Sequence, residues 1–154
     1  DSQRAGRSGY RHPGAGFRHH GRLPVGSGVA SAIAAAALAF LDGGKAEQSA
    51  TALAIALKNI LGLICDPVAG AVEVPCVKRN AMGVTNAMVA ADMALAGITS
   101  AIPADETVTA LCNVQVNLPP TLRNSGCGGL CATPTAQRIT EERYKELARK
   151  AGLA

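Results

Sequence analysis

Two cysteines with ten residues between them are the side chains of this sequence best suited to chemistry. Cys65 directly precedes Asp66-Pro67, and Cys76 directly follows Pro75. Because proline ends a helix and restricts the residue before it, the segment is predicted to be an extended loop with a thiol at each end. Thiols held in this way suit a metal ion or an iron–sulfur cluster. The spacing argues against structural zinc, whose paired cysteines usually have about two to four residues between them. The alternative is two buried cysteines that only fill space.

The elements that have to position these thiols are predicted to be helices. Hydrophobic residues make up 48% of the chain, aromatic residues only 3%, and Trp is absent, so the apolar mass is Ala, Leu, Val and Ile. Small side chains let helices pack at short distances. We therefore expect an all-α fold, a compact Ala-rich domain of about five helices, with the cysteine-bearing loop between the second and the third. The predicted helices cover residues 29–41, 46–64, 77–96, 103–117 and a last stretch from residue 139.

Apolar spacing and capping residues predict how the later helices pack. In the third helix, Met82, Val89 and Met93 are expected at apolar positions. In the last helix, Thr140 is a predicted N-cap, and Tyr144 lies on the apolar side. Each of these assignments names the side chains that should be buried or capped.

Two cations and an amide occupy the predicted first turn of the third helix, as Lys78, Arg79 and Asn80. The helix dipole disfavours cations at this end. An anion facing them, such as a substrate carboxylate or a negatively charged cluster, would explain their position. The alternative is that both cations point into water.

The glycine-rich segment 125–131 carries two further thiols, Cys127 and Cys131. Glycine permits close backbone approach, so this loop could line a cavity. A metal site on the two thiols is a further possibility. An ordinary flexible loop is the alternative.

The net positive charge of the chain comes from its first 22 residues. Residues 1–22 hold five Arg and one acid, whereas residues 23–154 hold ten basic and ten acidic residues. Residues 1–27 lack helical or strand periodicity and are predicted to be a disordered basic segment, with residues 28–154 as the helical domain. With Tyr10 and Phe17, the basic segment could also form a weak RNA-binding tail.

Residue types also limit the classes of site and of compartment. All three histidines precede residue 23, which excludes a His-based triad or a His-ligated metal in the helical domain. The odd count of five cysteines favours a reducing compartment, so we expect a cytoplasmic protein. No apolar run reaches the length of a membrane span, so no membrane association is expected.

Several segments, in order and at matching spacing over roughly residues 28–139, carry a resemblance to a known family. They are Ser31–Ala35, Glu47–Ala50, Asn59–Leu63, Cys65–Asn80, Ala90–Ala94, Ile102–Glu106, Gly128–Leu130 and Ala132–Pro134. In them the chain resembles the catalytic alpha chain of the iron–sulfur-dependent L-serine dehydratases. The segment Cys65–Asn80 is the most specific of these.

The resemblance implies a lyase that converts L-serine to pyruvate and ammonia, with a 4Fe–4S cluster as Lewis acid. It implies Cys65 and Cys76 as two cluster ligands. The position of the third ligand is occupied by Leu23, so Cys127 or Cys131 would have to substitute. The abrupt change of composition upstream of about residue 26 is also typical of a reading-frame error in the coding sequence.

The family has further sequence before this segment and a beta chain or an equivalent amino-terminal region. We therefore expect a fragment that is inactive alone, with L-serine and a beta chain as partners in a homo- or hetero-oligomer. Two alternatives stay open. One is a non-catalytic helical fragment or assembly module with buried structural cysteines. The other is a nucleic-acid binder, which the neutral helical domain disfavours, so no nucleic-acid partner is expected.

Overall fold

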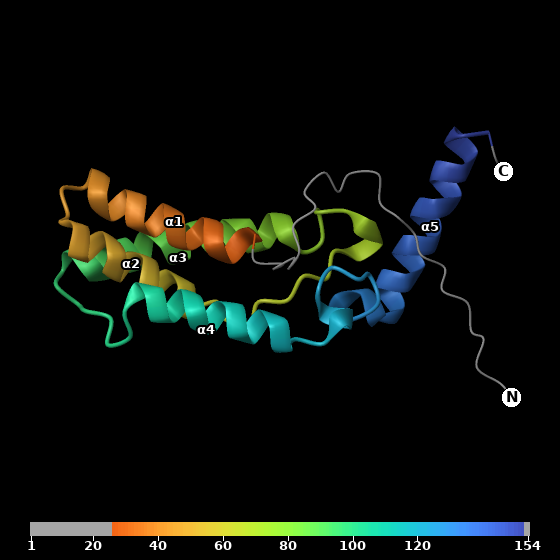
Figure 1. Cartoon of the computed structure of the whole chain (residues 1–154). Helices are drawn as coiled ribbons and strands as arrows, with labels where there is room; N and C mark the ends of the chain where they lie inside the picture. Colours follow the sequence, from red (N-terminus) through yellow and green to blue (C-terminus); the bar gives the residue numbers. More distant parts are fainter. Residues whose placement is uncertain (1–25, 153–154) are drawn as a thin grey trace, which may run out of the picture.

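The computed structural model describes residues 26–152, and in this part of the chain the regular elements are all helices (Figure 1). The all-α prediction is confirmed. The one β-type pairing within these residues is an isolated parallel bridge between Cys65 and Arg123. The elements are α1 (Gly26–Leu41), α2 (Ala46–Lys58), η1 (Val68–Gly70), α3 (Cys76–Leu95), α4 (Ala104–Asn117), η2 (Pro120–Leu122), η3 (Gly129–Ala132) and α5 (Pro134–Lys150).

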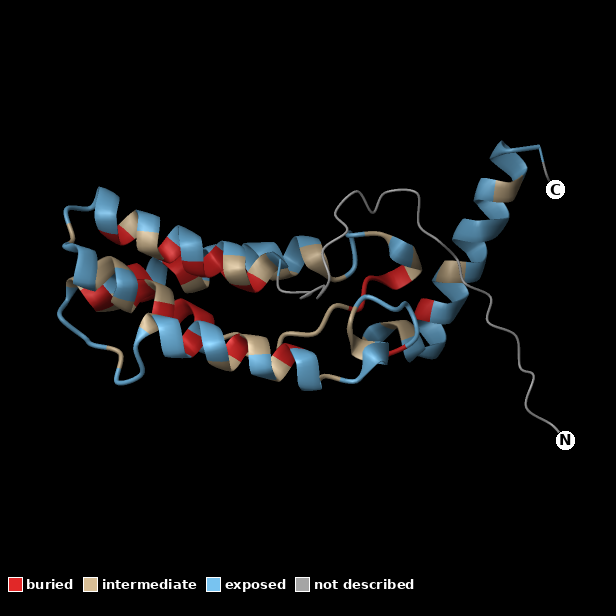
Figure 2. Ribbon diagram, in the orientation of Figure 1, coloured by how far each residue is buried: buried red, intermediate tan, exposed pale blue. Residues whose placement is uncertain are grey.

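Helices α1, α2 and α3 pack against one another, and α4 packs on α2. At the opposite end of the molecule from the α1–α2 turn, α5 contacts η1 and η3 (Figure 1). The buried residues concentrate between α1, α2 and α3, as Figure 2 shows. The cysteine-bearing loop therefore lies between the helical bundle and α5.

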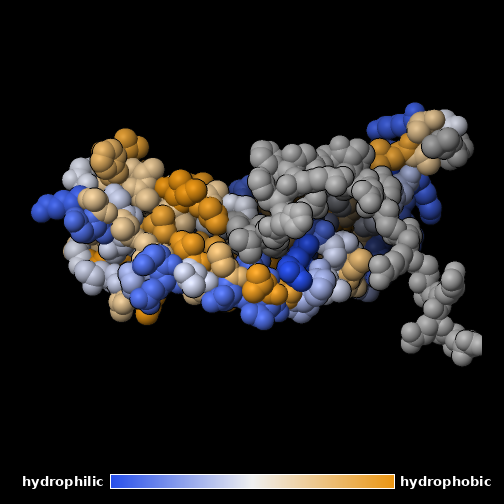
Figure 3. Space-filling view, viewed as in Figure 1, coloured by the Kyte–Doolittle hydropathy of each residue, from blue (hydrophilic) through white to orange (hydrophobic). Residues whose placement is uncertain are grey.

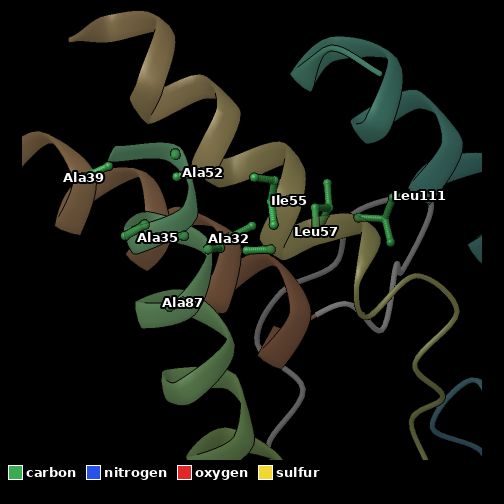
Figure 4. Packing of buried hydrophobic residues seen from close by; sticks show 12 residues of the cluster. Ala32, Ala35, Ala39, Ala52, Ile55, Leu57, Ala87 and Leu111 are labelled. Carbon is green, nitrogen blue, oxygen red and sulfur yellow. The ribbon is translucent and has the colours of Figure 1, made fainter. Parts of the chain in front are cut away.

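The core is built mainly from alanine (Figure 4). Alanine brings little apolar area but allows short distances between helix axes. The buried residues of this core are Ala32, Ala35, Ala39, Ala52, Ile55, Ala56, Leu57, Ala87, Ala90, Ala91, Ala94 and Leu111.

This close packing explains why the predicted apolar positions of α3 were partly wrong. Met82 and Val89 are 41% and 49% exposed, and only Met93 packs against the core. The buried positions of α3 are instead Gly83 and four alanines. Side chains as large as Met or Val do not fit where the helices are so close, so they lie on the outer surface.

One amide side chain joins the three packed helices. Asn86 on α3 donates through Nδ2 to Ser31 Oγ on α1 and to the Ala56 carbonyl on α2, both at 2.9 Å. Its own Oδ1 accepts from Asn59 Nδ2 at 2.9 Å. These hydrogen bonds fix how α1, α2 and α3 are placed relative to one another, which small alanine side chains alone specify weakly.

Three helix boundaries differ from the predicted ones by more than one residue. Helix α1 begins at Gly26 rather than at residue 29, and α2 ends at Lys58 rather than at residue 64. After α2, Gly62 adopts a positive φ of 84°, which a helix cannot include. The chain thus leaves the helix early and approaches the cysteines as turns.

The third difference is that α5 begins at Pro134, and its N-cap is Thr133 rather than the predicted Thr140. Thr133 Oγ1 accepts from Ala136 N, and Pro134 occupies the first helical position, where proline needs no partner for its nitrogen. Thr140 lies inside the helix and donates to the Ala136 carbonyl. Tyr144, predicted on the apolar side, is 43% exposed.

Apolar side chains also remain on the surface. Ile33, Phe40 and Leu41 on α1 are 59%, 68% and 76% exposed, and apolar surface gathers over α1 in Figure 3. Within residues 26–152, none of the helices combines the length and the apolar character that crossing a bilayer requires.

Candidate functional site

Cys76 begins α3, at the end of the connection from α2 as predicted. Cys65 lies within this connection rather than at its start, because α2 already ends at Lys58. Cys65 is half-buried in an extended segment. Its N–H donates to the Leu122 carbonyl at 3.0 Å, and its carbonyl accepts from Asn124 N at 2.6 Å. Cys76 is half-buried at the first position of α3. The backbone of each cysteine is therefore held by a defined element.

The electrostatic surroundings of Cys65 show which groups lie near it. Burial is the largest cause that raises the pKa of its thiol above the ordinary 9.0, and the charge of Cys76 is the next. Asp66 and Cys131 also raise the pKa of Cys65, whereas Arg79 lowers it. Cys65 and Cys76 thus lie within electrostatic range of each other, with one cation and one carboxylate beside them.

Asp66 connects the elements around this loop. Its side chain is 1% exposed. Oδ1 accepts from Arg79 Nη1 at 2.6 Å, and Oδ2 accepts from the backbone N–H of Leu130 at 2.7 Å. Arg79 Nη1 also donates to the Ile64 carbonyl at 2.9 Å.

The first turn of α3 was predicted to face an anion or water. Arg79 does face an anion, which is the carboxylate of Asp66 in the same chain. Lys78 is exposed, and Asn80 Oδ1 accepts from Ser27 Oγ on α1 at 2.5 Å. Of the two cations in this turn, Arg79 therefore faces a negative group and Lys78 is exposed to solvent.

The glycine-rich loop packs directly against the cysteine loop. A Cβ on Gly129 would lie 2.5 Å from Asp66 Oδ2 and 2.9 Å from Ile64 Cδ1, and Gly129 has a φ of 61°. Glycine is therefore required here by space and by backbone conformation. The sequence predicted that this loop could line a cavity, and these contacts show that it packs on the segment next to Cys65.

The two thiols of the glycine-rich loop differ. Cys131 is half-buried, and its Sγ donates to the Pro67 carbonyl at 3.2 Å. Burial, and then the charge of Asp66, raises the pKa of Cys131 above 9.0. Cys127 is exposed, and its Sγ contacts the Ser125 carbonyl at 3.5 Å. Cys131 is thus the one of the pair that lies against the cysteine loop.

Other candidate residues lie elsewhere. Cys112 is half-buried on α4. An open hollow of about 340 Å³ is lined by Asn113, Val114, Asn117 and Leu118, and none of the cysteines lines it. Leu23 and the three histidines lie outside the described residues.

Thiols are the donors that an iron–sulfur cluster takes, and two of them flank this loop. Within residues 26–152, however, no group of three or more His, Cys, Asp or Glu side chains is arranged to hold a metal ion. The described residues therefore offer thiols of the kind that a cluster takes, but no complete set of ligands.

Asp66 is the residue of this site that the sequence analysis did not single out. It was treated only as the residue before Pro67. The available signal was Arg79, a cation in an unfavourable first helical turn, which needed a carboxylate nearby.

Comparison with known proteins finds a family whose match includes the segments of both loops. The family described as Serine dehydratase alpha chain matches residues 24–131. This match contains the cysteine loop and the glycine-rich loop up to Cys131, and it begins near the change of composition at the amino-terminal side of α1.

Individual relatives extend the comparison. The chain is 61% identical over 115 residues to a probable L-serine dehydratase, alpha chain, of Bacillus subtilis, covering 75% of this chain and 38% of the relative. It is 59% identical over 108 residues to the corresponding probable alpha chain of Latilactobacillus sakei, covering 70% and 52%. It is 49% identical over 119 residues to the L-serine dehydratase, alpha chain, of Peptoniphilus asaccharolyticus, covering 77% and 41%. The chain spans about half or less of the length of these relatives, and it belongs to the serine dehydratase alpha chain family.

Proposed function

We propose that this chain is the part of an L-serine dehydratase that supplies two cluster ligands, in an enzyme that converts L-serine to pyruvate and ammonia. The observation that carries the proposal is that Cys65 and Cys76 flank one loop whose two sides are joined by an ion pair: Asp66, next to Cys65, contacts Arg79, three residues after Cys76, at 2.6 Å. Family membership supports the reaction, since the matched relatives are named L-serine dehydratases.

The proposed cofactor is a 4Fe–4S cluster, which when bound would supply a Lewis-acidic iron for the substrate hydroxyl. Cys65 and Cys76 would hold it as thiolates. Their loop is anchored at one end by the backbone pairing of Cys65 and at the other by α3. The ten residues between the thiols thus act as a fixed spacer.

The residue that would supply the third cluster ligand is not one of the two loop cysteines. Leu23 stands where the family resemblance expects a cysteine, so this position offers no thiol. Cys131 is the better candidate substitute in this chain, because it contacts Pro67 in the cysteine loop while Cys127 is exposed. Otherwise the ligand comes from outside the described residues, and the chain alone is inactive.

We propose that the complete enzyme is cytoplasmic and contains a beta chain or an equivalent region, in a homo- or hetero-oligomer. The names of the relatives as alpha chains support a second type of chain. The exposed apolar residues of α1 are compatible with such an assembly.

Anaerobic reconstitution of the 154-residue chain with ferrous iron and sulfide tests the cluster. We expect a visible absorption band and bound iron and sulfide, both lost in Cys65→Ser and in Cys76→Ser. Cys112→Ser on α4 is the matched control and should retain both. Pyruvate formation from L-serine is measured with and without an added beta chain.

The opposite result is equally informative. A chain that keeps its helical circular dichroism but binds no iron, whether or not a beta chain is present, contradicts the proposal. The alternative of a helical assembly module with structural cysteines would then be favoured.

A further inference from the structure

Asp66 is the only charged side chain that is fully buried in the part of the chain that the structure describes. A buried carboxylate is costly unless each oxygen has a donor. Here Oδ1 has Arg79 Nη1 at 2.6 Å and Oδ2 has Leu130 N at 2.7 Å. The carboxylate is therefore compensated only while both donors stay in place.

These donors belong to different segments, and each segment carries a cysteine. Asp66 itself follows Cys65. Arg79 lies three residues after Cys76, close to one turn further along α3. Leu130 directly precedes Cys131. One buried group thus joins the three segments that present partly buried thiols around this loop.

We propose that Asp66 is a positioning residue for the thiols of Cys65 and Cys76, acting through its contacts with Arg79 and with the backbone of Leu130. The role rests on the proposed cluster function. Groups of this kind orient ligands without touching the bound metal, and they tune how firmly it is held.

The fit around Asp66 is close, which supports a positioning role. A Cβ on Gly129 would lie 2.5 Å from Oδ2 and 2.9 Å from the Asp66 Cβ. Arg79 is held from a second direction by the Ile64 carbonyl at 2.9 Å. The carboxylate has little room to move relative to the two donors.

Asp66→Asn tests the proposal with nearly unchanged shape. An amide accepts through only one atom, so either Arg79 or Leu130 N–H loses its acceptor. Glu73→Gln is the matched control, because it makes the same chemical change at an exposed carboxylate in the same loop. All variants are made in the 154-residue chain, and far-UV circular dichroism checks that the helices are retained.

The first measurement needs no cluster. Dibromobimane bridges two thiols that lie close together, and mass spectrometry of peptides identifies the Cys65–Cys76 bridge. We expect the yield of this bridge to fall in Asp66→Asn and to be unchanged in Glu73→Gln. Equal yields in the wild type, Asp66→Asn and Glu73→Gln overturn the proposal.

The second measurement is iron retention after anaerobic reconstitution, by competition with a chelator. We expect the affinity for iron to be about 10- to 100-fold lower in Asp66→Asn than in Glu73→Gln. If no chain assembles a cluster while the bridge yield still falls in Asp66→Asn, the positioning role stands and the proposed function fails. If Asp66→Asn retains iron and bridge yield fully, the function stands and the positioning role fails.

A double-variant cycle with Arg79→Gln separates positioning from general destabilisation. The single variant Arg79→Gln also tests the proposal if Asp66→Asn folds poorly. Arg79→Gln removes the other side of the same contact at a half-buried position. Its own loss of bridge yield should be clear in the wild-type background and smaller in the Asp66→Asn background, since residues that share one contact are not additive. Fully additive losses, or no loss in Arg79→Gln, contradict the proposal.

Discussion

Ser31 Oγ on α1 donates a 2.6 Å hydrogen bond to the carbonyl of Gly83 on α3. At this contact a Cβ on Gly83 would lie 3.5 Å from Ser31 Cβ and 3.7 Å from the Ser27 carbonyl oxygen. These are ordinary contact distances. The space between the helices thus accepts one carbon atom at Gly83, which would already be in contact with α1.

Two substitutions at Gly83 are therefore expected to have opposite effects. Gly83→Ala should raise the free energy of unfolding by about 0.5–1 kcal/mol, because glycine is unfavourable inside a helix. Gly83→Val should lower it by about 1–3 kcal/mol, since its further methyl groups overfill the contact. Urea unfolding followed by circular dichroism measures both, and a stabilising valine would contradict close packing of α3 on α1 at Gly83.

Asn86 is expected to contribute strongly to the stability of the bundle. Asn86→Ala removes the donors to Ser31 Oγ and Ala56 O and leaves the Ala56 carbonyl without that partner. The expected loss is about 1–3 kcal/mol in the free energy of unfolding. The control is Thr85→Ala at the adjacent exposed position, where surface changes usually stay within about 0.5 kcal/mol. Equal unfolding midpoints of the two variants would contradict this role.

The all-α class and the position of the cysteine loop could be predicted, because they depend on local composition and on prolines beside the thiols. Which face of α3 is buried could not. Met82 is more hydrophobic than Ala87, yet Ala87 is 1% exposed and Met82 is 41% exposed. The distance between the helices decides this, and it depends on Ala35 and other residues far away in sequence.

The same limit applies to the candidate site. The loop with Cys65 and Cys76 was predicted from neighbouring residues. The role of Asp66 depends on the backbone N–H of Leu130, which is 64 residues away. Every residue except proline has a backbone N–H, so the residue types in the sequence do not indicate which N–H will meet Asp66.

Thr133 is expected to fix the start of α5. Thr133→Ala removes the side-chain acceptor for Ala136 N and should destabilise the first turn by about 1 kcal/mol. Faster amide hydrogen exchange in the first turn of α5, with unchanged exchange in α1, would be the expected result. Thr135→Ala, at an exposed position two residues further on, is the control. A stronger effect of Thr135→Ala would contradict Thr133 as the N-cap, and a stronger effect of Thr140→Ala would favour the predicted helix start near residue 139.

The raised pKa values of Cys65 and Cys131 predict how the stability of the metal-free chain depends on pH. Both thiols have pKa values above 9.0 in the folded chain, mainly because burial disfavours the thiolate. Between 9.0 and the folded pKa values, the folded state binds more protons than the unfolded state. The stabilising contribution is therefore complete below 9.0 and is lost as the pH rises through the folded pKa values. Urea unfolding across this pH window should show a decline that is weaker in the double variant Cys65→Ser and Cys131→Ser. The same decline in the wild type and in this variant would mean that other groups cause it.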